Sequence, residues 1–382
     1  MPDSHSLISA IDPAAVAEAR ALVDVPLRRV QHNQLVSRPA INRWAKSIGD
    51  RNPLWLDPGY ASASPLGQTV APPCWLYSVD DTCVALKLPG LHVVYGGTKW
   101  QFQRWVKLGE RIFAQSRLVD VQEKSGRFCG PMVLQTGETL FTGEAGETVA
   151  KATSQVLRTQ RQGAVDSGKY RGWRKHSFSP KEALAVEEAY DAEEIRGGKP
   201  RYWDDVTAGQ SLGPIVRGPL TSEEVIQFVC ATRPSPGFKQ FLRQRQRHPE
   251  AAFLDPDTGS WESWEASMLR DEVAQMFGFP FAHDAGIDRI SWLGNLITNW
   301  MSDQGFLKSL DVSLTLPNVY GDATWCRGRV TRRYRSDGLH LVDLALWCDN
   351  QRGQETARGQ ATVSLPNRGQ LEVGYGLSQP GP

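Results

Sequence analysis

One order of elements occurs twice in this chain, and this duplication constrains its fold more than any other feature. Each half begins with an amphipathic helical pattern, continues through a loop and a second apolar helical stretch, and ends in segments of alternating polarity. Two pairs of short segments match between the halves, 107–110 with 319–322 and 146–153 with 353–362. A duplicated unit of this kind predicts an α+β protein with antiparallel sheets.

The periodicity places the individual elements. We expect helices over 13–23, 39–48 and 222–231, a buried helix over 74–86, and the strongest helix of the chain over 284–301. We expect strands over 98–106, 111–119, 132–141, 148–156, 313–316, 324–330 and 339–347. Residues 159–200 are polar and charged, so we interpret them as a linker between a first repeat over 1–158 and a second over 201–382.

Composition excludes several classes of protein. The chain has 382 residues, of which 40% are hydrophobic, enough for a sizeable core. Lys and Arg number 43 against 42 Asp and Glu, so we expect neither nucleic acid nor a membrane as a partner. Six cysteines without a C-x-x-C pair indicate reduced thiols in a cytoplasmic protein and predict no metal site. We also expect no secretory signal and no membrane-spanning helix.

The loop after the first amphipathic helix has the shape of a catalytic site. It runs over 49–55, Gly-Asp-Arg-Asn-Pro-Leu-Trp, and a second apolar run follows at Val70-Ala71-Pro72-Pro73. A carboxylate beside a glycine, an Asn-Pro turn and a new helix start make a tight loop that presents side chains to a cleft.

These residues resemble the MaoC-like and FAS1-like acyl dehydratases. The second half resembles their catalytic repeat around 271–274, 282–284 and 292–301. The resemblance spans roughly residues 25–365 and implies a double hot-dog fold, in which each repeat wraps a curled antiparallel sheet around a central helix. It also implies an acyl thioester of CoA or of a carrier as substrate, with no separate cofactor. In active relatives an Asp-x-x-x-x-His loop supplies base and acid, and a backbone N–H at a helix start polarises the thioester carbonyl.

This chain departs from that pattern in both repeats. In the first, Asp50 is present, but Trp55 stands five residues later where the family has histidine. In the second, our alignment places the aspartate position near Ser263 and the histidine position near Met268. No shift of one or two residues restores an Asp and a His five apart.

Four residues are candidates for the chemistry. Asp50 is either the acid–base carboxylate or a helix cap that satisfies loop N–H groups. His283 and Asp284 precede the strongest helix, where they either poise a proton or serve as a packed residue and a cap. Asp288 lies one turn further on and either reaches the cleft or forms a surface pair with Arg289.

Five residues are candidates for binding the substrate. Trp55 and other tryptophans either line an acyl pocket or pack in the core. Gly90 lies near the position where the family places its oxyanion N–H, and His92 is beside it; a Pro-Gly turn is the alternative. Arg243 and Arg245, in the basic stretch 239–248, either meet the phosphates of CoA or a carrier protein, or form a solvated loop.

The sequence therefore predicts an acyl-CoA hydratase or dehydratase that acts on a bulky acyl thioester. Two alternatives stay open. One is an acyl-thioester binding subunit whose partner chain supplies the missing pair, and the other is a thioesterase. We expect a homodimer or a hetero-oligomer with a second hot-dog chain.

Overall fold

The computed structural model describes residues 11–369, except 89, 127–129, 161–164, 166, 167, 233–236, 248, 250, 251 and 256. The expected positions Cys129 and His248 therefore lie outside the described residues. Within the described part, no helix combines the length and apolar character needed to cross a bilayer.

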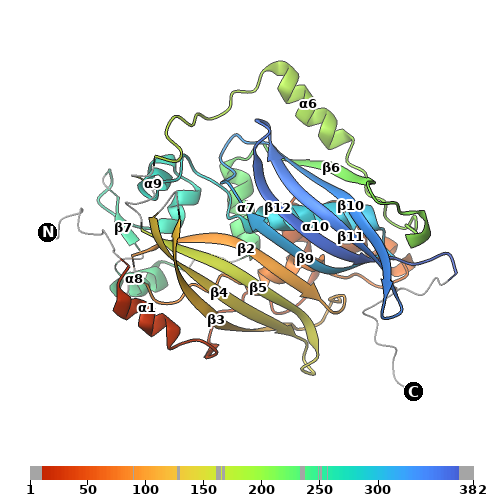
Figure 1. Ribbon diagram of the computed structural model, residues 1–382, viewed down its shortest axis with the longest axis horizontal. Helices are drawn as coiled ribbons and strands as arrows, with labels where there is room; N and C mark the ends of the chain where they lie inside the picture. Colours follow the sequence, from red (N-terminus) through yellow and green to blue (C-terminus); the bar gives the residue numbers. More distant parts are fainter. Residues whose placement is uncertain are drawn as a thin grey trace.

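Ten strands form one antiparallel sheet that runs through both repeats. In chain order they are β1 (Pro26–Leu27), β2 (His92–Phe102), β3 (Phe113–Gly126), β4 (Gly130–Thr142), β5 (Thr148–Thr159), β6 (Ser211–Arg217), β9 (Phe306–Leu314), β10 (Thr324–Ser336), β11 (Leu339–Asn350) and β12 (Glu355–Ser364). Their order across the sheet is β1-β3-β4-β5-β2-β9-β12-β11-β10-β6, so each strand of the first repeat has a counterpart in the second. Antiparallel pairing of β2 with β9 joins the halves, as Figure 1 shows. The expected duplicated double hot-dog fold is confirmed.

Helices and one small hairpin complete the chain. The α-helices are α1 (Pro13–Arg20), α2 (Arg38–Ser47), α3 (Pro53–Leu56), α4 (Pro58–Ala63), α6 (Pro180–Asp191), α7 (Ser222–Thr232), α8 (Phe238–Arg247), α9 (Asp271–Met276) and α10 (Ile287–Met301). Three 3-10 turns are η1 (Pro73–Ser78), η2 (Trp203–Asp205) and η4 (Trp264–Met268), and the hairpin pairs β7 (Ala252–Leu254) with β8 (Trp261–Ser263). The segment interpreted as a linker thus contains α6, which packs on β6 through Val186 and Val216.

The second repeat has the central helix that the fold requires. All 15 residues of α10 are buried, and the helix lies against β9 to β12 and β6 (Figure 1). It begins at Ile287, three residues later than expected, because Gly286 adopts a positive φ of 79° and the Asp288 side chain accepts the Ala285 N–H.

The first repeat has no equivalent helix over 74–86. Only the short turn η1 forms there, and residues 79–88, 90 and 91 are irregular chain. Local side chains explain the difference: Asp80 accepts the Thr82 N–H at 2.7 Å, and Asp81 accepts the Cys83 N–H at 2.9 Å. Such turns compete with helical hydrogen bonds, and Thr82 has a positive φ of 58° that a helix does not allow.

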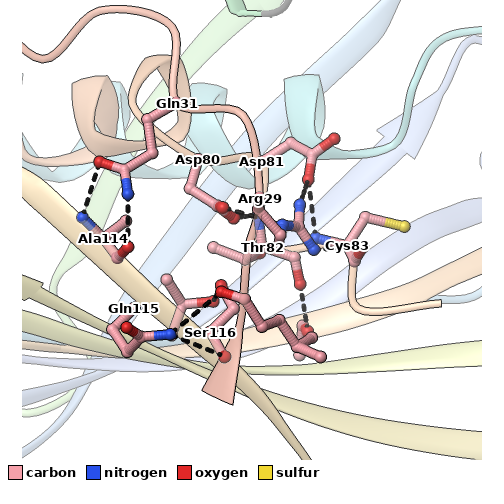
Figure 2. A network of polar contacts seen from close by, with 12 residues as sticks. Arg29, Gln31, Asp80, Asp81, Thr82, Cys83, Ala114, Gln115 and Ser116 are labelled. Atoms are coloured by element: carbon pink, nitrogen blue, oxygen red, sulfur yellow. Dashed lines mark hydrogen bonds and ion pairs between the residues drawn. The ribbon is translucent and has the colours of Figure 1, made fainter. Parts of the chain in front are cut away.

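Two arginines hold this irregular segment in place. From one side, Arg29 pairs with Asp80 at 2.9 Å and with Asp81, and donates to the Cys83 carbonyl at 2.7 Å (Figure 2). From the sheet, Arg158 donates to the carbonyl oxygens of Lys87, Leu88 and Leu91 and to the Gln135 side chain. These four bonds measure between 2.7 and 3.3 Å.

One hydrophobic core serves both repeats. Trp44, Trp75 and Trp100 from the first repeat belong to the same buried cluster as Leu293 and Leu310 from the second. Most of the tryptophans therefore pack as core residues, as the sequence predicts.

Candidate active site

A cavity of about 1200 Å³ lies between the irregular segment of the first repeat and the start of α10 in the second. Its first-repeat wall comes from residues between Asp81 and Gly96, and its second-repeat wall from η4, residues 277–289 and residues 314–317. The cavity thus opens beside the position where a central helix of the first repeat would lie. The predicted residues Gly90, His92, His283 and Asp284 all line it.

Asp284 is fixed in a buried ion pair. Its carboxylate accepts from Arg289 Nε at 2.7 Å and Nη2 at 3.0 Å, and both residues are buried. The third nitrogen of Arg289 donates to the carbonyl oxygens of Leu316 and Thr356 at 2.6 Å each. This pair anchors the chain at the start of α10, and it occupies the carboxylate that the sequence nominated for proton transfer.

His283 is left with a basic nitrogen. Its Nδ1 lies 2.7 Å from the Asp284 carbonyl oxygen. Because a carbonyl only accepts, Nδ1 carries the hydrogen and Nε2 carries a lone pair. Nε2 is buried and has no hydrogen-bond partner among the described residues. Burial lowers the pKa of His283, so the imidazole is neutral at pH 7.

A second histidine faces the same aromatic wall. The His92 ring lies 4.4 Å from the ring of Phe277 and 5.2 Å from that of Phe279, and Phe279 in turn lies 4.3 Å from His283. Phe279 therefore separates the two histidines. Gly90 occupies a turn at φ 76°, as the Pro-Gly alternative predicts.

The helix start on the cavity wall belongs to α10. Gly286 and Ile287 line the cavity at that end. The first N–H groups of a helix have no acceptor within it and attract developing negative charge. The sequence reasoning missed these two residues because it started the helix at Asp284, which placed Gly286 inside the helix.

Asp288 lies behind this helix start and is absent from the cavity wall. Its carboxylate accepts the Ala285 N–H at 2.9 Å, which makes it a cap for the first turn. Burial, and then the neighbouring Asp284, raise its pKa well above the ordinary value, so this carboxyl favours its protonated form.

Asp50 and Trp55 also lie away from the cavity, buried at 2% exposure each. Asp50 Oδ1 accepts the Asn52 N–H at 2.9 Å, while Asn52 caps α3. Arg217 fills the space beside this loop, donating to the Ile48 and Gly49 carbonyl oxygens at 2.8 and 3.2 Å. Burial raises the pKa of Asp50 to about 7. The first-repeat loop is thus buried within the fold, and its Asp50 and Trp55 side chains do not line the cavity.

The corresponding loop of the second repeat does reach the cavity. Ser263 and Met268, the positions aligned with the family's aspartate and histidine, both line it. Ser263 accepts the Glu265 N–H as the cap of η4. Of the basic stretch, Gln244 lines the cavity, whereas Arg243 and Arg245 do not.

Comparisons with known proteins agree with this architecture. The family model described as "FAS1-like, dehydratase domain region" matches residues 27–152. A UPF0336 protein of Parafrankia sp. is 30% identical over 129 residues, which are 32% of this chain and 82% of that protein. A UPF0336 protein of Streptomyces avermitilis is 29% identical over 129 residues, 32% of this chain and 83% of that protein.

Solved structures extend the likeness over both repeats. A MaoC-like dehydratase covers 91% of this chain and 99% of its own, with a TM-score of 0.63 and 14% identity. A conserved hypothetical protein from Mycobacterium tuberculosis with a double hotdog fold covers 87% of this chain and 92% of its own, with a TM-score of 0.50 and 10% identity. The chain belongs to the same family as these UPF0336 proteins, with a FAS1-like dehydratase region in its first repeat and the fold of the MaoC-like dehydratases.

The sequence alignment places Asp50 and Trp55 at the motif positions of the first repeat, and Ser263 and Met268 at those of the second. The histidines that line the cavity are His92 and His283, both outside these positions. The described part of the chain gathers no group of three or more histidine, cysteine, aspartate or glutamate side chains suited to a metal ion.

Proposed function

We propose that this chain binds a bulky acyl thioester in the cavity between its repeats and adds or removes water across the C2–C3 bond. One observation carries the proposal: His283 on the cavity wall is neutral and holds an unpaired Nε2, directly before the helix start formed by Gly286 and Ile287. A base and a positive helix end are the two groups that this reaction requires.

In the hydration direction, His283 Nε2 accepts a proton from water as the water oxygen bonds to C3. The electron pair of the C2–C3 double bond moves toward the thioester carbonyl, where the N–H groups of the α10 start stabilise the enolate oxygen. The imidazolium then returns its proton to C2. Asp284 and Arg289 position this histidine by fixing the chain that follows it. CoA, or a carrier thiol, enters only as part of the substrate.

The size and the apolar lining of the cavity support the proposal of a bulky acyl group. Its volume of about 1200 Å³ exceeds the ordinary range of small-molecule pockets, which reaches about 1000 Å³. Apolar side chains from both repeats line it, among them Leu91, Leu157, Met268, Phe277 and Leu314.

The test compares purified protein with one variant and one control. Wild type should hydrate 2-enoyl-CoA thioesters, and His283→Ala should lower kcat by about 100-fold or more, because proton transfer by a positioned side chain contributes that much. The kcat/KM profile of wild type should fall on its acidic side with a midpoint below 6.5, since burial lowers the pKa of His283. His340→Ala, which changes a histidine beside Trp203 and Asn367, is the control. A full rate in His283→Ala would exclude this residue from the mechanism.

A second candidate follows from Trp55 and Met268. Because both histidine positions of the motif are apolar, the chain is alternatively an acyl-thioester binding subunit whose partner supplies the Asp/His pair. That function gives binding of enoyl-CoA without turnover, and activity only after addition of a second hot-dog chain. A thioesterase would release free thiol in the same assay. The homo- or hetero-oligomeric state and the cytoplasmic location stay predictions.

A further inference from the structure

A continuous exposed patch crosses α8 and the β7–β8 hairpin. Phe238, Leu242 and Arg245 recur at i, i+4 and i+7 and so share one face of α8. The Arg245 guanidinium lies 4.6 Å above the Trp261 ring, and Trp261 pairs across the hairpin with Leu254. We call these five residues the rim patch.

The apolar members of the rim patch are unusually exposed. Phe238 is 98% exposed, Leu242 41%, Trp261 43% and Leu254 48%, and no residue of α8 is buried. Four large apolar side chains joined in one patch differ from the scattered single residues that normal surfaces carry. Joined exposed patches mark contacts with another molecule.

Positive charge lies on the helix side of this apolar patch, whereas Asp255 and Glu262 of the hairpin are paired with Arg270. Besides Arg245, α8 carries Lys239, Arg243 and Arg247, and the helix has no acidic residue. The chain as a whole has a net charge of only +1, so the charge of α8 is a local feature. An acidic partner is therefore the electrostatic complement of the patch.

The rim patch adjoins the candidate active site. Gln244, next to Arg245 in α8, lines the cavity, and so does Ser263 at the end of β8. A molecule seated on the patch would therefore stand at the cavity, where it could deliver a tethered acyl chain.

We propose that the rim patch docks an acidic carrier protein that presents the acyl group as a thioester. This inference rests on the proposed function, because only a chain that takes acyl thioesters has such a partner. The phosphates of CoA would meet the arginines but leave Phe238 and Leu242 in water. A lipid surface fits an apolar face continuous along a helix, whereas this patch continues from α8 onto a hairpin through a stacked arginine.

Binding is measured with a fluorescently labelled acidic acyl-carrier protein that bears no acyl chain, so that the result is independent of turnover. We expect anisotropy to show saturable binding that weakens with salt. The double variant Arg243→Glu/Arg247→Glu should weaken binding at least tenfold, as should Phe238→Ser/Leu242→Ser. Lys181→Glu, on α6 and distant from α8 in Figure 1, is a charge-reversal control away from the patch and should bind as wild type.

A kinetic comparison identifies the partner. The arginine double variant should raise KM at least tenfold for an enoyl group on the carrier protein and leave KM unchanged for the same group on CoA. Equal effects on both thioesters, absence of carrier binding, or selective binding to phosphatidylglycerol vesicles that the double variant loses would each overturn the proposal. Carrier binding without hydration by wild type would contradict the proposed function and support the docking surface.

Discussion

Adjacent residues at the start of α10 have opposite roles because of their partners. The sequence nominates Asp284 together with His283 for acid–base chemistry, but Arg289 occupies both oxygens of Asp284. His283 donates Nδ1–H to a backbone carbonyl and keeps Nε2 as a base. The sequence places both at a helix start, yet it cannot show that a guanidinium five residues later folds back onto the carboxylate.

At the same scale, Asp50 makes the free energy of unfolding depend on pH. Its folded-state pKa of about 7 lies above the ordinary 3.8, so the folded protein binds its proton more tightly than the unfolded chain. The stabilising contribution of that proton is complete below pH 3.8 and is lost as pH rises toward 7.

Asp50→Asn keeps the Oδ1 acceptor for Asn52 and removes this titration. We expect the free energy of unfolding of the variant, relative to wild type, to increase by about 3 kcal/mol from pH 4.5 to pH 8. Urea denaturation at the two pH values measures the change. Asp191→Asn, an exposed carboxylate on α6, should show no such difference. A difference independent of pH would contradict the raised pKa.

At the scale of elements, the irregular segment of the first repeat (79–88, 90 and 91) is the main departure from the sequence prediction. Apolar residues over 74–86 favour a buried helix, but the carboxylates of Asp80 and Asp81 form local turns and then meet Arg29 (Figure 2). Arg29 lies about 50 residues earlier in the chain, so local periodicity contains no sign of this contact. The cavity is lined by this segment, so its position could not be predicted from the sequence.

Arg158 supplies the test of this element. Its side chain is 4% exposed and donates to three backbone carbonyl oxygens of the segment, so Arg158→Met would remove a donor from each; the Leu88 oxygen would keep only the Leu91 N–H at 3.4 Å. We expect the free energy of unfolding to fall by about 3 kcal/mol. Because the segment forms one wall of the cavity, KM for enoyl-CoA should rise as well.

Arg117→Met is the control for this change. Arg117 lies on the same sheet and pairs with Glu138 at 2.7 Å, but it is exposed, so its loss should cost much less than the loss of Arg158. Equal destabilisation by the two variants, measured by urea unfolding, would show that Arg158 does not support the segment.

The whole molecule depends on the junction between its repeats. The sequence predicted the duplication and most strands from alternation, but it placed only the end of β9, over 313–316. β9 lies between β2 and β12 in the middle of the sheet, and Phe306 and Leu307 are both buried at its start. The adjacent apolar residues Phe306 and Leu307 break the alternation at the start of β9, which is regular only from Leu310 onward. Sequence patterns therefore predicted each repeat better than the joint between them.

Gly97 makes this joint possible. It pairs with Ser313 of β9 at φ 146°, and a Cβ added to it would lie 2.2 Å from the Val312 carbonyl oxygen. Gly97→Ala must therefore separate β2 from β9, and we expect it to lower the free energy of unfolding by about 3 kcal/mol or more. Gly109→Ala, with φ 92° and no atom within 4 Å of the added Cβ, should cost only about 1 kcal/mol of backbone strain. Equal costs at the two glycines would contradict a joint held by this close approach.

One core and one sheet span both repeats, so wild type should unfold in a single calorimetric transition. Two separate transitions in wild type would contradict a joint that makes the two repeats one cooperative unit.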